Sequence, residues 1–147
     1  MAYKERTSTY DPALVVVTWG ELRLEGFTDG TAIKVERAED RYSTKVGLDG
    51  EGARTRNNNR SGTVEVTLLQ TSLTNGELST KAQLDDDSAI PLPPQPLTVK
   101  DLNGFSLHHA ANAWIQKTPA SEYAKEAGDR TWVFGTASLR NYDGGNL

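Results

Sequence analysis

The chain has 147 residues, a net charge of −4 and a pI of about 5.2, so it forms one domain and lacks the basic field that holds nucleic acid. It contains no cysteine, which excludes disulfides, thiolate metal sites and thiol nucleophiles. The longest apolar run, Leu14–Val17, is too short to cross a bilayer, so we expect no membrane contact.

The N-terminal part of the chain predicts a polar arm followed by three strands. Residues 1–10 are polar and are expected to form an N-terminal arm. Leu14–Trp19 is rich in β-branched and aromatic residues, and Leu22–Glu25 alternates apolar and charged residues, so the two runs predict a hairpin. Thr31–Arg37 alternates again, which places its apolar residues on one face of a strand.

Residues 38–62 offer almost nothing to bury. Such a long polar excursion inside a small domain is functional or disordered in most proteins, and we expect an extended loop or β-ribbon that leaves the body. This segment carries a cluster of arginines and asparagines, namely Arg54, Arg56, Asn57, Asn58, Asn59 and Arg60.

The middle of the chain predicts one strand and one helix. Thr63–Thr71 is the best strand candidate in the chain, with Val64, Val66 and Leu68 on one side. A helix is expected over 74–87, because Thr74 and Glu77 match a T-x-x-E capping box. Its expected buried stripe consists of Leu78, Ala82 and Leu84. The helix is expected to stop at the run Asp85-Asp86-Asp87, since the helix dipole disfavours anions at its C-terminus.

The C-terminal half predicts further strands. Leu97–Leu107 reads as a hairpin around Asn103-Gly104, the strongest two-residue turn signal. His108–Gln116 is apolar and alanine-rich, which fits a strand or a short helix, and a strand that continues the hairpin is favoured. Glu122–Ala127 is expected to form a helical turn, and Thr131–Arg140 the last strand. With six to eight strands and short connections, the expected fold is mostly β: an antiparallel β-sandwich or partial barrel with one flanking α-helix.

None of the residue patterns supports catalysis or metal binding. His108 and His109 are adjacent and would point to opposite faces of a strand, which is poor geometry for a shared metal. We expect one of them to be packed and the other exposed. The acidic run at residues 85–87 lacks the spacing of a calcium loop. No serine lies in a G-x-S-x-G motif. We therefore expect no enzyme activity, no cofactor and no metal.

The arginine cluster has three possible roles. Arginine forks suit carboxylates, and the chain supplies acidic residues at Asp85, Asp86 and Asp87, so self-association is the favoured interpretation. A merely solvated loop is the second. Nucleic-acid binding is the third, and it is disfavoured because no aromatic residues are interleaved with the arginines.

Seven motifs occur in order between about Tyr10 and Leu139. They are Val15–Gly20, Gly26–Gly30, Val46–Arg54, Asn57–Thr63, Thr67–Ser72, Val99–Gly104 and Ala113–Ile115. Together they resemble the tail tube proteins of contractile-tailed bacteriophages, a family related to the tubes of type VI secretion and contractile bacteriocins.

The resemblance implies a non-enzymatic structural protein. Six copies would form a ring in which neighbouring sheets join into one continuous β-barrel, and the rings would stack into a hollow tube that conducts the genome. The implied partners are further copies of the chain, the tail sheath protein, baseplate and tail-terminator proteins, and tape measure protein and DNA that pass through without specific binding. The implied location is the virion tail, assembled in the bacterial cytoplasm. The hypothetical contacts between subunits or rings are Arg54, Arg56, Asn57, Asn58, Asn59, Arg60, Asp85, Asp86 and Asp87.

Two alternatives stay open. One is a tube-initiator or tail-completion protein of the same fold, which would form rings that do not extend. The other is a β-sandwich module that binds carbohydrate or peptide. Such a module should expose clustered aromatic residues, whereas Trp19, Trp114 and Trp132 lie in apolar strand contexts and are expected in the core.

Overall fold

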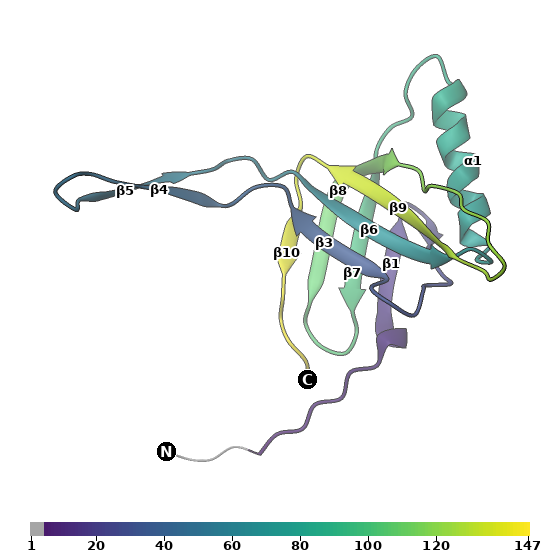
Figure 1. Ribbon diagram of the computed structural model, residues 1–147, viewed down its shortest axis with the longest axis horizontal. Coiled ribbons are helices and arrows are strands. Elements are labelled where there is room, and N and C mark those ends of the chain that lie inside the picture. The colour runs from purple at the N-terminus through teal and green to yellow at the C-terminus, as the bar shows by residue number, and fades with distance from the viewer. Residues whose placement is uncertain (1–4) are drawn as a thin grey trace.

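The computed structural model describes residues 5–147 and contains one large bent sheet, a two-stranded ribbon and a single helix (Figure 1). The elements in chain order are η1 (Pro12–Leu14), β1 (Val15–Trp19), β2 (Leu22–Arg23), β3 (Ile33–Arg37), β4 (Tyr42–Val46), β5 (Gly52–Arg56), β6 (Gly62–Leu69), α1 (Thr74–Asp87), β7 (Gln95–Asp101), β8 (Leu107–Lys117), β9 (Asp129–Thr136) and β10 (Arg140–Tyr142). The pairings between these strands are antiparallel, as the short connections predict.

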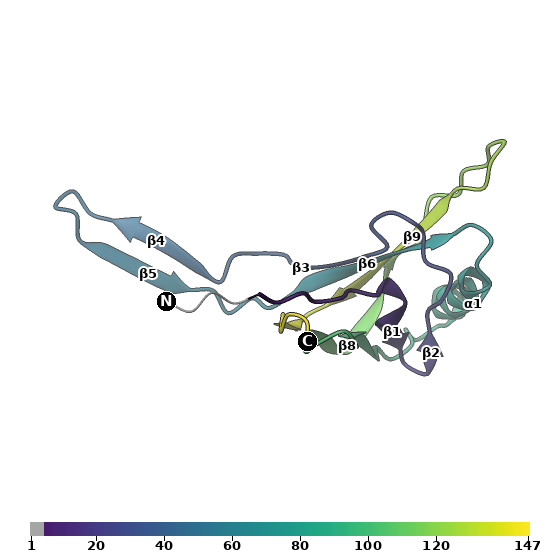
Figure 2. The same ribbon diagram turned by 90° about the horizontal axis from the view of Figure 1, so that it is seen from below.

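The large sheet has the strand order β2-β1-β7-β8-β9-β6-β3, and β10 also pairs with β8. The long strand β8 is central to its bend, because one of its edges pairs with β9 near Ile115 and with β10 near His108. The sheet folds back so that β3, β6 and β9 cross over β1, β7 and β8 (Figures 1 and 2). The expected mostly β fold with one helix is confirmed, as a partial barrel that stays open between β1–β2 and β3.

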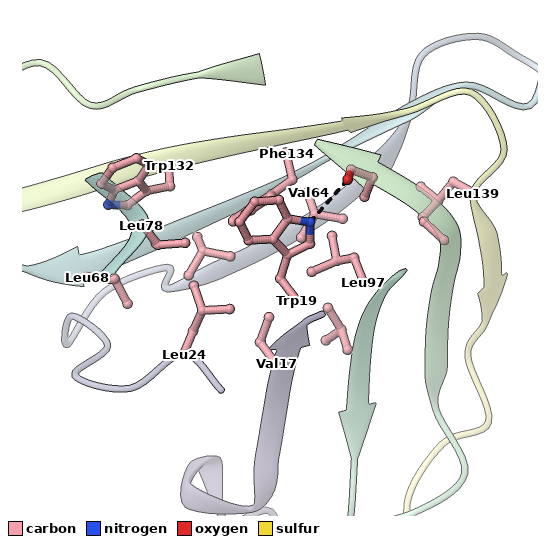
Figure 3. Close-up of a cluster of buried hydrophobic side chains, with 14 residues drawn as sticks. Val17, Trp19, Leu24, Val64, Leu68, Leu78, Leu97, Trp132, Phe134 and Leu139 are labelled. Atoms are coloured by element: carbon pink, nitrogen blue, oxygen red, sulfur yellow. Dashed lines mark hydrogen bonds between the residues drawn. The ribbon is translucent and has the colours of Figure 1, made fainter. Parts of the chain in front are cut away.

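The core lies between these two halves of the sheet and follows from the two-residue period of the strands. In β6, Val64 and Val66 are buried and pair with buried Phe134 and Trp132 of β9. From the opposite half, Trp19 of β1 reaches the centre of the cluster (Figure 3). Its indole N–H donates to the Ala113 carbonyl at 3.1 Å, which satisfies its polar atom inside the core.

The helix α1 closes the core at one end, but its start differs from the expected capping box. Thr74 lies inside the helix, and Leu73 at the N-cap makes no side-chain hydrogen bond. The Thr74 hydroxyl instead accepts from the Glu25 backbone N–H, at 3.2 Å, and so ties the helix to the segment after β2. Leu78 is fully buried, whereas Leu84 is 58% exposed, so the expected buried stripe is wrong at Leu84.

Three connections also differ from the expectations. The β7–β8 hairpin forms, but its loop spans residues 102–106, and Asn103-Gly104 does not adopt the positive φ angles of a type I′ turn. Residues 122–127 form no helical turn. The last strand is interrupted after Thr136, and β10 follows as a separate strand.

The N-terminal arm leaves the body as an extended segment (Figure 1). Residues 5–11 are exposed and carry no helix or strand. Residues 1–4 of the expected arm lie outside the described residues.

Candidate assembly surfaces

The ribbon of β4 and β5 extends from the body as an isolated hairpin (Figures 1 and 2). All ten residues of its two strands are exposed, so the ribbon makes no contribution to this chain's core. The turn at its tip is built by Gly50, which has a φ of 89°, and by the Gly47 N–H, which donates to the Glu51 carbonyl. Leu48 is fully exposed at this tip.

The arginines predicted as contact residues take two different places on the ribbon. Arg54 Cζ lies over the Tyr42 ring, 4.7 Å from its centroid, which is a cation–π contact between β5 and β4. Arg56 and Arg60 line a hollow at the ribbon base, together with Arg37 and Arg41. In residues 5–147 the contacts within 4 Å between basic and acidic side chains are Lys34–Glu36 and His108–Asp143, so the ribbon arginines pair with no carboxylate in this range.

The asparagines of the same cluster serve mainly to shape the ribbon base. The Asn57 amide donates to the Glu39 carboxylate at 2.7 Å and to the Asp40 carbonyl. Asn57 and Asn59 side-chain oxygens accept backbone N–H groups two residues further on, which forms consecutive Asx turns. The hydrogen bond from Asn57, and then that from Asn59, lowers the pKa of Glu39 from its usual 4.5. Asn58 is exposed.

The acidic run lies at the opposite end of the molecule from the ribbon (Figure 1). All three aspartates are exposed at the C-terminal end of α1. The Asp85 carboxylate accepts the Leu92 N–H at 2.8 Å and so shapes the exit from the helix. Asp86 and Asp87 make no ion pair within residues 5–147. The arginines and aspartates therefore do not meet inside one chain.

A groove runs beside these aspartates between α1 and β8. We call it the helix groove; its lining includes Trp19, Lys81, Asp85, Asp86, Leu92 and Trp114. Lys81 lies over the Trp19 ring at 5.4 Å. Trp114 is 40% exposed, so the expectation that all three tryptophans are core residues is wrong for this one. Trp114 lies in an apolar run of the sequence, but its exposure depends on which elements cover β8, and a sequence window does not contain those elements.

The two edges of the large sheet form the remaining surface. The outer edge of β3 pairs with no strand of residues 5–147, and β2 at the other edge has only two residues. A cleft between the edges is lined by apolar residues of both halves, including Val15, Ile33 and Val35. Unpaired N–H and C=O groups at such an edge are a template for pairing with another chain.

The histidines show no geometry for shared chemistry. Both are half-buried, so the expectation of one packed and one exposed histidine is wrong. His108 Nδ1 lies 2.9 Å from the Asn141 side-chain oxygen, and His109 Nδ1 lies 3.1 Å from the Thr98 hydroxyl. Among residues 5–147, no group of three or more His, Cys, Asp or Glu residues is placed to hold a metal ion. No helix in the same range is long and apolar enough to span a membrane.

Comparisons with solved structures return assembly proteins of contractile injection systems. The anti-feeding prophage cap, described as a tube-terminating cap, gives a TM-score of 0.61 at 8% identity and covers 96% of this chain and 95% of that chain. A sheath/tube terminator of an extracellular contractile injection system, PVC, gives 0.60 at 8% identity and covers 93% and 99%. A chain of the PVC sheath–tube complex gives 0.62 at 10% identity and covers 91% of each. At these identities the similarity establishes the fold.

Comparisons of sequence establish the family. Structural protein ORF10 of Pseudomonas phage KPP10 is 29% identical over 147 residues, which cover 96% of this chain and 85% of that protein. Residues 16–144 match the family described as the Bacteriophage PhiTE tail tube protein. That family is structural, which confirms the expectation of a non-enzymatic virion protein. The chain belongs to the Bacteriophage PhiTE tail tube protein family.

Proposed function

We propose that this chain forms the inner tail tube of a contractile phage tail, as hexameric rings that stack around a channel for the genome. The observation that carries this proposal is the open sheet of a tail tube family member, in which the β3 edge is unpaired and both β1 and β2 lie at the other edge. The edge of one copy would pair with the edge of its neighbour. The backbone N–H and C=O groups that are unpaired in the single chain would then form the hydrogen bonds that close the ring.

The ribbon and the helix end supply a second contact in this proposal. The ribbon arginines and the aspartates at the end of α1 are exposed and opposite in charge, and the ribbon and α1 lie at opposite ends of the molecule (Figure 1). Contact therefore requires a second copy. We propose that Arg54, Arg56 and Arg60 of one subunit approach the acidic end of α1 in another. Asn58 extends the same surface, whereas Asn57 and Asn59 act by fixing the ribbon base.

The net charge agrees with the role of a conduit. At −4 the chain does not attract a polyanion, and each neutralised phosphate would slow a passing genome. The proposed partners are the tail sheath, baseplate and tail-terminator proteins on the outside and at the ends of the tube. Tape measure protein and DNA would occupy the channel without specific binding. Assembly would take place in the bacterial cytoplasm.

A terminator, initiator or completion ring is the second candidate. The cap and the PVC terminator match this chain as well as the tube-complex chain does, so the fold alone does not distinguish these roles. Negative-stain electron microscopy of the purified chain, over a range of concentration and salt, separates them. Long hollow tubes support the tube role, and six-fold rings that never stack support a terminator or initiator. A monomer that persists at high concentration refutes both.

A further inference from the structure

Three segments that are distant in the sequence meet at the root of the N-terminal arm. They are the arm itself, the β7–β8 loop at residues 102–106, and the C-terminal tail after β10. We call this meeting point the arm anchor. Asn103 lies at its centre and is only 9% exposed, although it belongs to a loop.

The Asn103 side chain pairs with the arm as a β-strand backbone would. Its oxygen accepts the Asp11 N–H at 2.8 Å, and its amide donates to the Asp11 carbonyl at 2.9 Å. The Asp101 carboxylate accepts both the Asn103 backbone N–H and its side-chain amide, at 2.9 and 2.7 Å. Since a carboxylate accepts but does not donate, this contact fixes which end of the amide faces each Asp11 group. Asp101 therefore fixes the Asn103 side-chain amide in the orientation that it needs to form hydrogen bonds with the arm.

The C-terminal tail contacts the β7–β8 loop at Asn103 and Gly104. The Asn103 carbonyl accepts the Leu147 N–H at 3.1 Å, and Gly104 forms an antiparallel bridge with Asn146. A Cβ on Gly104 would overlap the Gly145 carbonyl oxygen, so the close approach of the tail requires glycine there. The Asn146 side chain donates to the Thr9 carbonyl at 3.0 Å, and the Arg6 guanidinium donates to the Asn146 carbonyl at 2.6 Å.

These contacts direct a segment that contributes nothing to the core of its own chain. Residues 5–11 are exposed, yet side chains from two other segments hold them. Chain termini are usually poorly ordered unless they are tied down. Holding an extended segment in place before it binds reduces the conformational entropy lost on binding.

We propose that Asn103 is a positioning residue for assembly, which aims the N-terminal arm at a second copy of this chain. The proposal rests on the proposed function, because it needs a neighbouring subunit to receive the arm. Asn146 also holds the arm, at Thr9, which is two residues closer to the tip than Asp11. Neither side chain needs to touch the neighbour.

The test combines protease access with assembly. Trypsin cleavage after Arg6 is followed by mass spectrometry in the unassembled chain, and the concentration at which tubes form is measured by light scattering and microscopy. The variants are Asn103→Ala, Asn146→Ala and a chain that begins at Asp11. The matched control is Asn75→Ala, because the Asn75 side chain also makes three hydrogen bonds, to Leu69, Ser72 and Trp132, none of which belongs to the arm anchor.

Asn103→Ala should speed cleavage after Arg6 and raise the assembly concentration, each by about tenfold, since it removes hydrogen bonds to the arm worth roughly that factor. Asn146→Ala should give a smaller change in the same direction, and Asn75→Ala should lower the melting temperature without changing cleavage at Arg6. The inference is overturned if Asn103→Ala behaves like Asn75→Ala. It is also overturned if the chain that begins at Asp11 assembles like the parent, a result that leaves the tube itself intact. A parent chain that never assembles refutes the proposed function, and the positioning role fails with it.

Discussion

A charge exchange between the ribbon and the helix end tests the proposed contact between subunits. Arg54→Asp with Arg56→Asp makes the ribbon acidic, and Asp86→Lys with Asp87→Lys makes the helix end basic. Asp85 is left unchanged because its carboxylate holds the Leu92 N–H. Each pair of changes should weaken assembly, and all four together should restore it, since the contact is then re-formed with opposite signs.

The expected size follows from the exposure of these groups. An exposed ion pair contributes about 0.2–1 kcal/mol, and reversal both removes the attraction and adds a repulsion of similar size. Two reversed pairs therefore amount to about 1–4 kcal/mol per contact. Because about 1.4 kcal/mol is a factor of ten, the assembly concentration should rise by about fivefold to several hundredfold. The effect should shrink at high salt, where the Debye length falls to about 3 Å at 1 M.

Light scattering against protein concentration, at two salt concentrations, measures this shift, and microscopy verifies that the particles are tubes. The fourfold variant carries the parent's net charge, so it also controls for bulk repulsion. If it assembles no better than the two halves predict by addition, the ribbon does not face the helix end. In that case Arg54 and Arg56 act elsewhere or are simply solvated.

Three further predictions concern the single chain. Leu78→Ala should cost about 2–5 kcal/mol of unfolding free energy in urea titrations, because Leu78 is fully buried, whereas Leu84→Ala should change it by less than about 0.5 kcal/mol; equal losses would contradict the assigned helix face. The hydrogen bonds that the Glu39 carboxylate accepts lower its pKa in the folded chain. The stability that these bonds contribute is therefore present above the unfolded pKa of 4.5 and is lost as the pH falls through the lowered pKa of the folded chain. In an NMR titration, the side-chain amide signals of Asn57 should therefore shift only at acidic pH, where the hydrogen bond to Glu39 weakens. Signals that stay unchanged down to pH 2 would refute this. Acrylamide should quench Trp114 in preference to Trp19 and Trp132, and Trp114→Phe should remove the accessible fraction; quenching that survives the substitution would show that a supposed core tryptophan is exposed.

Strand alternation was readable from the sequence wherever a strand has one buried face. Val64, Val66 and Leu68 alternate with polar residues, and all three are buried. Short-range chemistry was less reliable. Thr74 matches a helix-capping motif in residue type and spacing, but its hydroxyl accepts a hydrogen bond from Glu25, which is 49 residues away in the sequence. Asn103 precedes a glycine in a pair that is typical of a tight turn, but its side chain forms hydrogen bonds with Asp11 of the arm. Polar residues follow the partners that tertiary structure offers, and a sequence window does not contain those partners.

The ribbon shows the same division for the candidate site. Its lack of apolar residues predicted a segment that leaves the body, and its arginines are exposed. The asparagines looked equivalent to the arginines in the sequence, yet Asn57 and Asn59 close Asx turns at the ribbon base. Trp114 was missed because exposure on β8 depends on how α1 and the linker after it cover that strand. Surface residues of a long loop could be predicted as a set, but not the role of each member.

The open edges raise the question of why single chains would not pair indiscriminately. The edge strand β3 exposes the charged side chains of Lys34 and Glu36, whose Nζ and Oε2 atoms lie 3.5 Å apart. Charged residues on an edge strand discourage pairing with unrelated chains. At the other edge β2 has only two residues and, within residues 5–147, pairs only with Thr18 and Trp19 of β1, so this edge is divided into short pieces, and short edge strands discourage pairing with unrelated chains. A second copy differs from a stray strand because it brings a ribbon, an arm and an acidic helix end along with its edge. If the tube proposal holds, edge pairing alone is weak by construction, and the charged ribbon and the anchored arm supply the specificity that selects another copy of the same chain.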